Sequence, residues 1–88
     1  MKDSIIALIK EKISVEFIEI KDRAAGHAHH KHYDGGAHYK MLIVSDDFKD
    51  LSLLKRHQLI YSILGHMITK EIHALALTTK TIKEYKSL

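Results

Sequence analysis

The sequence of 88 residues contains no cysteine and no proline. Without thiols, this chain alone cannot form a disulfide, a cysteine nucleophile, a CxxC redox site or a cysteine-ligated metal site. No apolar stretch approaches the roughly 18 residues that a membrane-spanning helix needs, so no membrane partner is expected. The first residues lead directly into an amphipathic pattern, and a cleaved signal peptide is not expected. These absences favour a cytoplasmic protein.

Recognised catalytic motifs are also missing. The sequence contains no HExxH motif, no Walker A loop and no GxSxG motif. Serine, histidine and aspartate all occur, but their spacing does not indicate a catalytic triad, and no pair of carboxylates stands in an apolar context. A non-enzymatic role is therefore expected.

The composition that remains is that of one soluble globular domain. Hydrophobic residues make up 45% and charged residues 28% of the chain, which is too short for two cores of ordinary size. The formal net charge of +3 is only mildly basic. Histidine is the unusual residue, because it occurs eight times in the chain.

Hydrophobic spacing predicts three helices and three strands. Asp3 or Ser4 can cap the first helix, and Asp46, Asp47 or Asp50 can cap the second, which contains Gly65 at a cost of about 1 kcal/mol relative to alanine. In chain order, the predicted elements are a helix over 5–13, strands over 15–21 and 38–45, a helix over 53–67, a strand over 72–77 and a short helix after a capping box at Thr81–Glu84.

This order, α-β-β-α-β-α, predicts a single α+β domain over residues 1–88. Three strands form one sheet, and helices cover one of its faces in a two-layer arrangement. The first two strands follow each other directly and are expected to pair antiparallel. Between them, residues 22–37 lack periodicity and end in two adjacent glycines, which predicts a long loop of a kind that is usually functional or disordered.

The predicted loop carries the densest chemistry of the chain. Its histidines can bind zinc, copper, nickel or iron through neutral imidazole, and the pattern does not indicate which metal. The alternative is a solvated polar loop that binds metal only in vitro. The four histidines of this group are His27, His29, His30 and His32.

The other histidines have plainer interpretations. His73 begins an otherwise apolar strand, where a lone histidine is more often a satisfied, partly buried residue than a ligand. His57 lies on the apolar stripe of the long helix, and we expect it to make one buried hydrogen bond. His38 is expected to have a structural role, and His66 to lie on the surface.

Basic side chains are spread along the chain rather than gathered in one stripe. Lys49, Lys55 and Arg56 are the candidates for contact with nucleic-acid phosphates, and Lys40 is a further basic residue on a strand. A few such contacts would give weak, strongly salt-dependent binding. A scatter of this kind is usually a solvated face.

Several short segments resemble the BolA family, over roughly residues 5–86. They follow the family's pattern SHF…IVS…F…RH…HAL in order and spacing, and Ala25-Gly26-His27 resembles its loop signature. The family usually has glycine at the position of Asp50, so this turn is expected to differ. The matching segments are His38-Tyr39-Lys40, Ile43-Val44-Ser45, Phe48, Arg56-His57 and Ile72-His73-Ala74-Leu75.

The resemblance implies a fold similar to the class II KH domain and a role in iron–sulfur chemistry. BolA proteins associate with monothiol glutaredoxins and share a [2Fe-2S] cluster with them and their glutathione. The family's cluster histidine falls on His73. The second ligand lies in the loop, where this chain is similar to the histidine subgroup. His27 matches that position, and His29, His30 and His32 compete with it.

Two other functions stay open at this point. KH-like folds bind nucleic acid, and BolA relatives are associated with transcriptional control, although this chain has no GxxG loop. The loop histidines alone would also make a zinc-binding module that needs no partner.

Overall fold

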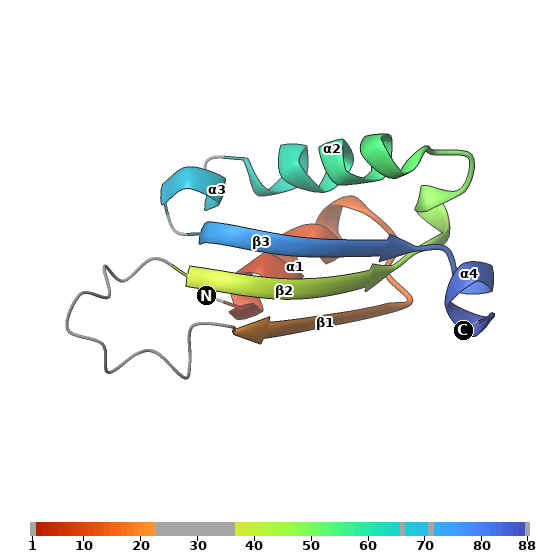
Figure 1. Ribbon diagram of the computed structural model, residues 1–88, viewed down its shortest axis with the longest axis horizontal. Coiled ribbons are helices and arrows are strands. Elements are labelled where there is room, and N and C mark those ends of the chain that lie inside the picture. Colours follow the sequence, from red (N-terminus) through yellow and green to blue (C-terminus); the bar gives the residue numbers. More distant parts are fainter. Residues whose placement is uncertain (1, 23–36, 66, 71, 88) are drawn as a thin grey trace.

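The structure of the protein is a computed structural model that describes residues 2–22, 37–65, 67–70 and 72–87. The predicted α-β-β-α-β-α order is confirmed, with a 3-10 turn and one short helix in addition (Figure 1). The predicted loop at 22–37 lies outside the described residues apart from its two ends. The elements are α1 (Lys2–Lys12), β1 (Phe17–Asp22), β2 (Ala37–Val44), η2 (Asp46–Phe48), α2 (Leu53–Leu64), α3 (Met67–Lys70), β3 (Ile72–Lys80) and α4 (Ile82–Lys86).

The three strands form one mixed sheet in the order β1-β2-β3. As predicted, β1 and β2 pair antiparallel, from Phe17 opposite Val44 to Asp22 opposite Tyr39. β2 and β3 pair parallel, and the chain crosses between them through α2 and α3. β3 continues to Lys80, beyond the predicted end at residue 77, because its last residues still pair with β2.

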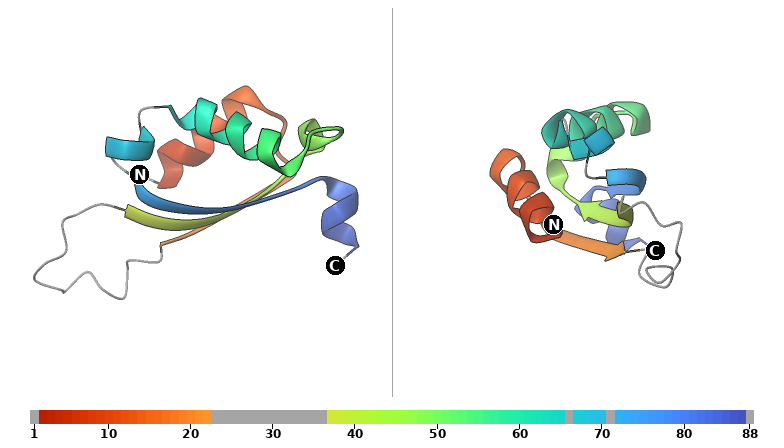
Figure 2. Two further views of the ribbon diagram at one scale, coloured as in Figure 1. Left: turned by 45° about the horizontal axis from the view of Figure 1, so that its top comes forward. Right: turned by 90° about the vertical axis from the view of Figure 1, so that its left-hand side faces the viewer.

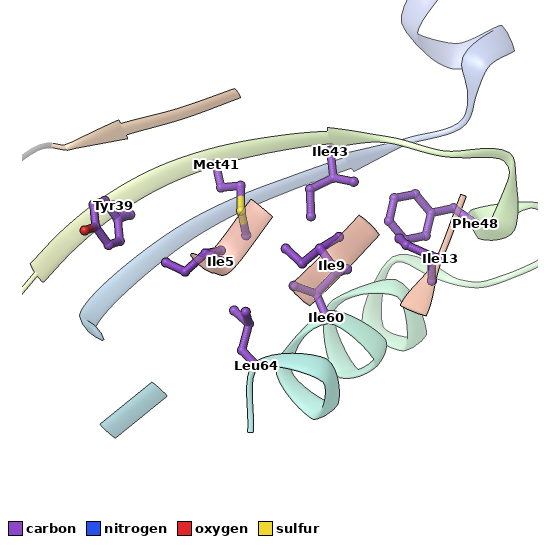
Figure 3. Close-up of a cluster of buried hydrophobic side chains, with 9 residues drawn as sticks. All are labelled: Ile5, Ile9, Ile13, Tyr39, Met41, Ile43, Phe48, Ile60 and Leu64. Carbon is purple, nitrogen blue, oxygen red and sulfur yellow. The ribbon is translucent and has the colours of Figure 1, made fainter. Parts of the chain in front are cut away.

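Helices α1 and α2 pack on one face of this sheet, which confirms the two-layer arrangement (Figure 2). Alternate residues of β2 point from the sheet toward the two helices, as the period of a strand requires (Figure 3). These side chains close a core between the layers. Its buried members are Ile5, Ile9, Ile13, Tyr39, Met41, Ile43, Phe48, Ile60 and Leu64.

The N-cap of α2 is Ser52, so the predicted caps Asp46, Asp47 and Asp50 are wrong. The Ser52 side chain accepts a hydrogen bond from the backbone N–H of Lys55 at 3.2 Å. Asp46 and Asp47 instead belong to η2 (Asp46–Phe48), a separate 3-10 turn whose N-cap is Ser45. Local sequence does not distinguish one long helix start from a 3-10 turn followed by a helix.

Asp46 and Asp47 bind segments that are distant in sequence. The backbone N–H of Ser14, just after α1, donates to Asp47 Oδ2 at 2.8 Å. The backbone N–H of Ile82, at the start of α4, donates to Asp46 Oδ1 at 3.1 Å. Ser45 Oγ also donates to the carbonyl of Ser14. We call residues 45–47 the junction turn, because it connects the sheet to both terminal parts of the described chain.

The long helix predicted over 53–67 is wrong in its continuity. α2 ends at Leu64, and Gly65 has φ = 56°, a left-handed conformation that glycine adopts at low cost. The N–H of Gly65 donates to the Tyr61 carbonyl at 2.9 Å and completes the last turn. A short helix, α3, then begins at Met67. Apolar spacing continues across this break, which is why periodicity alone did not reveal it.

Asp50 also has a left-handed backbone, with φ = 64°. It is the only non-glycine residue in this conformation among the residues that the structure describes. Aspartate tolerates this conformation better than most residues, and glycine tolerates it better still.

In the described part of the chain, no helix is long and apolar enough to cross a membrane.

Candidate functional site

One end of the sheet brings three points of the chain together. β1 ends there at Asp22, β2 begins there at Ala37, and β3 begins there at Ile72, which is the partner of Ala37 (Figure 1). Ala37 is therefore next to the start of β3, and Asp22 lies one strand further away, at the same end of the sheet. His27, His29, His30 and His32 belong to that segment and lie outside the described residues. The antiparallel pairing of β1 with β2 and the parallel pairing of β2 with β3 together produce this arrangement.

His73 is the second residue of β3, and its backbone lies at this end. Ala37 pairs with Ile72 and His38 pairs with Ala74, so the register shifts by one residue and leaves His73 without a partner on β2. Such an extra residue is the mark of a β-bulge. Bulges occur preferentially at sheet edges and beside functional sites, where they re-aim side chains.

His38 and Tyr39 lie on opposite faces at the same end of the sheet. His38 is exposed, whereas Tyr39 is buried against the core. Each of these two residues makes a further interaction, so neither is free. Within the described ranges, no group of three or more histidine, aspartate or glutamate residues is arranged to hold a metal ion.

We expected one buried hydrogen bond from His57, and the structure shows that Nε2 does not make it among the described residues. His57 lies half-buried in α2, and its Nε2 atom is buried without a hydrogen-bond partner among the described residues. Thr79 Oγ1 on β3 is likewise buried without a hydrogen-bond partner among the described residues. His66 lies outside the described residues.

Arg56, a predicted phosphate contact, is directed into the protein instead. Its guanidinium forms a bidentate pair with Glu84 of α4, at 2.7 Å to Oε1 and 3.1 Å to Oε2. It also donates to the Leu51 carbonyl at 3.0 Å and lies over the Phe48 ring, 5.9 Å from its centroid. Only 12% of the Arg56 side chain is exposed. The structure thus gives Arg56 a role in joining α2 to α4.

The pair with Arg56 changes the acidity of Glu84. The hydrogen bond from Arg56, followed by the bond from the Thr81 backbone, lowers the pKa of Glu84 to about 2. The predicted capping box at Thr81 is confirmed, since Thr81 and Glu84 exchange side-chain and backbone hydrogen bonds. The sequence indicated this box but gave no signal for the partner 28 residues away.

Lys49 and Lys55, the other predicted phosphate contacts, are both exposed. Lys49 forms a surface ion pair with Asp46 at 3.4 Å. They lie on different elements, one after η2 and one in the first turn of α2. The structure therefore leaves their side chains accessible but does not arrange them in a stripe.

Sequence reasoning missed a hollow of about 280 Å³ on the sheet face opposite α1 and α2. The alternation of charged residues along β1 and β2 indicated that one sheet face is charged. Only the strand register shows that these residues surround one hollow. The side chains around it are Glu19, Lys21, Lys40, Leu42, Thr78 and Lys80.

Comparison with known proteins identifies the family. The family model described as BolA-like protein matches residues 9–84. The DNA-binding transcriptional regulator BolA of Haemophilus influenzae is 39% identical, over 96% of this chain and 84% of the relative. The regulator of the same name in Escherichia coli is 37% identical, over 91% and 78%. The solved BolA domain of SufE1 from Arabidopsis thaliana has a TM-score of 0.78 and 33% identity, covering 93% of this chain and 92% of its own. This chain belongs to the BolA-like protein family.

Proposed function

We propose that this protein is a non-enzymatic accessory protein of iron–sulfur cluster handling. It binds a monothiol glutaredoxin with its glutathione and shares a [2Fe-2S] cluster with them, for trafficking or iron sensing. The observation that carries the proposal is the convergence of the His73 backbone with both ends of the histidine-rich segment at one end of the sheet. The bulge at His73 adds a local departure from regular pairing at the same point.

The donor set of the chain suits a shared cluster. The protein has no cysteine, so it supplies imidazoles, and the partner and glutathione supply thiolates. In this proposal His73 is one ligand, and one of the histidines at 27–32 is the second. Two neutral imidazoles on one iron raise the reduction potential relative to an all-thiolate cluster.

The test is anaerobic cluster reconstitution with a monothiol glutaredoxin and glutathione. We expect the visible absorption and circular dichroism spectra to change when this protein is present. His73→Ala should abolish that change while the far-ultraviolet spectrum of the protein stays native. His38→Ala is the matched control, because His38 lies on β2 at the same end of the sheet.

An unaltered cluster spectrum with His73→Ala would contradict the ligand assignment. Single alanine variants of His27, His29, His30 and His32 then identify the second ligand as the one that reproduces the effect of His73→Ala. Tight zinc binding that needs no partner and survives His73→Ala would favour a metal site formed by the segment alone.

A second candidate function is nucleic-acid binding in transcriptional control. It is favoured by the two bacterial relatives named as DNA-binding transcriptional regulators. Lys49 and Lys55 are the exposed candidates for phosphate contact, while Arg56 would have to leave Glu84 to contribute. Titration of labelled duplex DNA at two salt concentrations tests this function. The absence of saturable binding at physiological salt would contradict it.

A further inference from the structure

The sheet face opposite α1 and α2 has a distinct chemical character. Within the described chain, α4 is the helix that approaches this face, and it closes only one end (Figure 2). The strand register places outward residues side by side in rows across the three strands. One row contains Lys21, Lys40 and Ala76, the next contains Glu19, Leu42 and Thr78, and the last contains Phe17, Val44 and Lys80.

The first row contains an unfavourable pair. Lys21 and Lys40 are direct cross-strand partners, and both side chains are exposed on the same face. Like charges directly opposite each other destabilise a sheet. In the described structure, no carboxylate lies within 4.0 Å of either ammonium group or of Lys80. The fold therefore holds these ammonium groups without a direct ion pair among the described residues, although Glu19 lies beside the same hollow and Lys80 interacts with Glu84 at longer range.

The last row combines charge with aromatic surface. Lys80 lies four residues along the strand direction from the Lys21–Lys40 row, which is about 13 Å. In the same row, on the other side of Val44, the Phe17 ring stacks on Tyr85 of α4, with the ring centroids 5.8 Å apart. Phe17 keeps 39% of its surface exposed. Leu42 and Thr78 form an uncharged floor between the two charged ends.

We propose that this face binds single-stranded nucleic acid. Lys21 and Lys40 contact phosphates at one end of the hollow, Lys80 contacts a phosphate further along the strand, and a base packs against the aromatic pair of Phe17 and Tyr85. The inference rests on the second candidate function and deepens it by naming the surface and the form of nucleic acid. None of these residues belongs to the proposed cluster ligands.

The arrangement suits a strand better than a single small anion. The ammonium groups are divided between the two ends of the hollow, so they match a ligand that carries several spaced negative charges. A charged groove with an adjacent aromatic surface is the usual means of binding single strands. Glu19, in the middle row, repels a negatively charged ligand, so removal of its charge should strengthen binding.

The experiment is fluorescence anisotropy with a labelled thymidine 12-mer and with a 12-base-pair duplex. With three phosphate contacts, the affinity of the native protein for the single strand should fall about 20-fold between 50 and 200 mM salt. In Lys21→Gln/Lys40→Gln the fall should be about 3-fold, because one contact remains. Removing a like-charge pair should not impair folding, and circular dichroism verifies this.

The matched control is Lys2→Gln/Lys10→Gln, which removes the same charge from exposed positions of α1 and should leave single-strand binding unchanged. Lys49→Gln/Lys55→Gln tests the other candidate phosphate contacts. Phe17→Leu should weaken single-strand binding at least about 5-fold, because it removes a stacking surface. Glu19→Gln should strengthen it.

Four results would overturn the inference. Loss of single-strand binding only in Lys49→Gln/Lys55→Gln, or binding of duplex without single strand, would assign the nucleic acid to another surface and leave the second candidate function standing. Equal competition by poly-glutamate, together with no effect of Phe17→Leu, would assign the face to acidic protein segments. Binding of neither nucleic acid would overturn both the inference and that function.

Discussion

Asp50 shows how a single residue can keep a fold while straining it. Its φ of 64° lies where the BolA resemblance leads one to expect glycine, and its side chain is exposed. The turn is therefore held in a backbone conformation that glycine adopts at lower cost than aspartate. Within it, the N–H of Leu51 donates to the Phe48 carbonyl at 3.1 Å, and the cap of α2 follows at Ser52.

We expect Asp50→Gly to stabilise the protein by about 0.5–1 kcal/mol, since relief of the left-handed strain exceeds the added freedom of the unfolded chain. Urea unfolding measures the difference. Asp50→Ala is the control and should destabilise by a similar amount, because alanine keeps the Cβ and loses the polar group. Equal stability of the two variants would show that φ at this position carries no cost.

Glu84 makes stability depend on pH in a defined direction. Its pKa falls from 4.5 to about 2 in the folded protein, chiefly through the hydrogen bond from Arg56. The folded state therefore favours ionised Glu84. This stabilisation is fully present above pH 4.5 and is lost as the pH falls toward 2.

Glu84→Gln should be less stable than the native protein at pH 7, and the difference in unfolding free energy should shrink as the pH falls from 4.5 toward 2. Chemical unfolding of both proteins at several pH values measures this gap, and comparison of the two cancels the titration of the other carboxylates. Lys83→Gln, in the same helix, is the control. A gap that is independent of pH would mean that Glu84 stabilises α4 without its charge.

At the level of elements, sequence periodicity predicted the order of helices and strands, the antiparallel pair and the capping box at Thr81. These features depend on residues a few positions apart. It missed the break at Gly65 and the cap at Ser52, because apolar spacing continues through the first and acidic residues preceded the second. It also missed the parallel extension of β3, which depends on β2 and not on the local sequence of residues 78–80.

The candidate site was likewise only partly predictable from the sequence. The sequence singled out His73 and the histidines at 27–32, and the ligand roles of both remain proposals. Only the strand register could reveal that His73 lies at a shift in pairing and that three lysines surround one hollow. The internal role of Arg56 was equally inaccessible, because its partner belongs to another element.

For the whole molecule, one small core carries most of the stability. A chain of this length buries a modest fraction of its surface, so its margin is small. Among the described residues, Phe48 is the largest side chain that is fully buried, and it lies between the core and the Arg56 guanidinium. Loss of this ring should therefore affect both layers.

We expect Phe48→Ala to destabilise the protein by about 3–5 kcal/mol, enough to approach its entire stability. Phe48→Leu should cost less, because it keeps most of the volume. Thermal and urea unfolding measure both variants. A cost below about 1 kcal/mol for Phe48→Ala would mean that the core lies elsewhere than in this structure.

The junction turn has a consequence for the order of folding. Its three long-range hydrogen bonds close chain segments of 31, 33 and 36 residues. Closing segments of this length has an entropic cost that is paid before the contacts form, but it rises only slowly with length. Asp46 and Asp47 are synthesised before Ile82, so the hydrogen bond from Ser14 can form before the hydrogen bond from the start of α4. Completion of the fold is thus tied to the last residues of the domain.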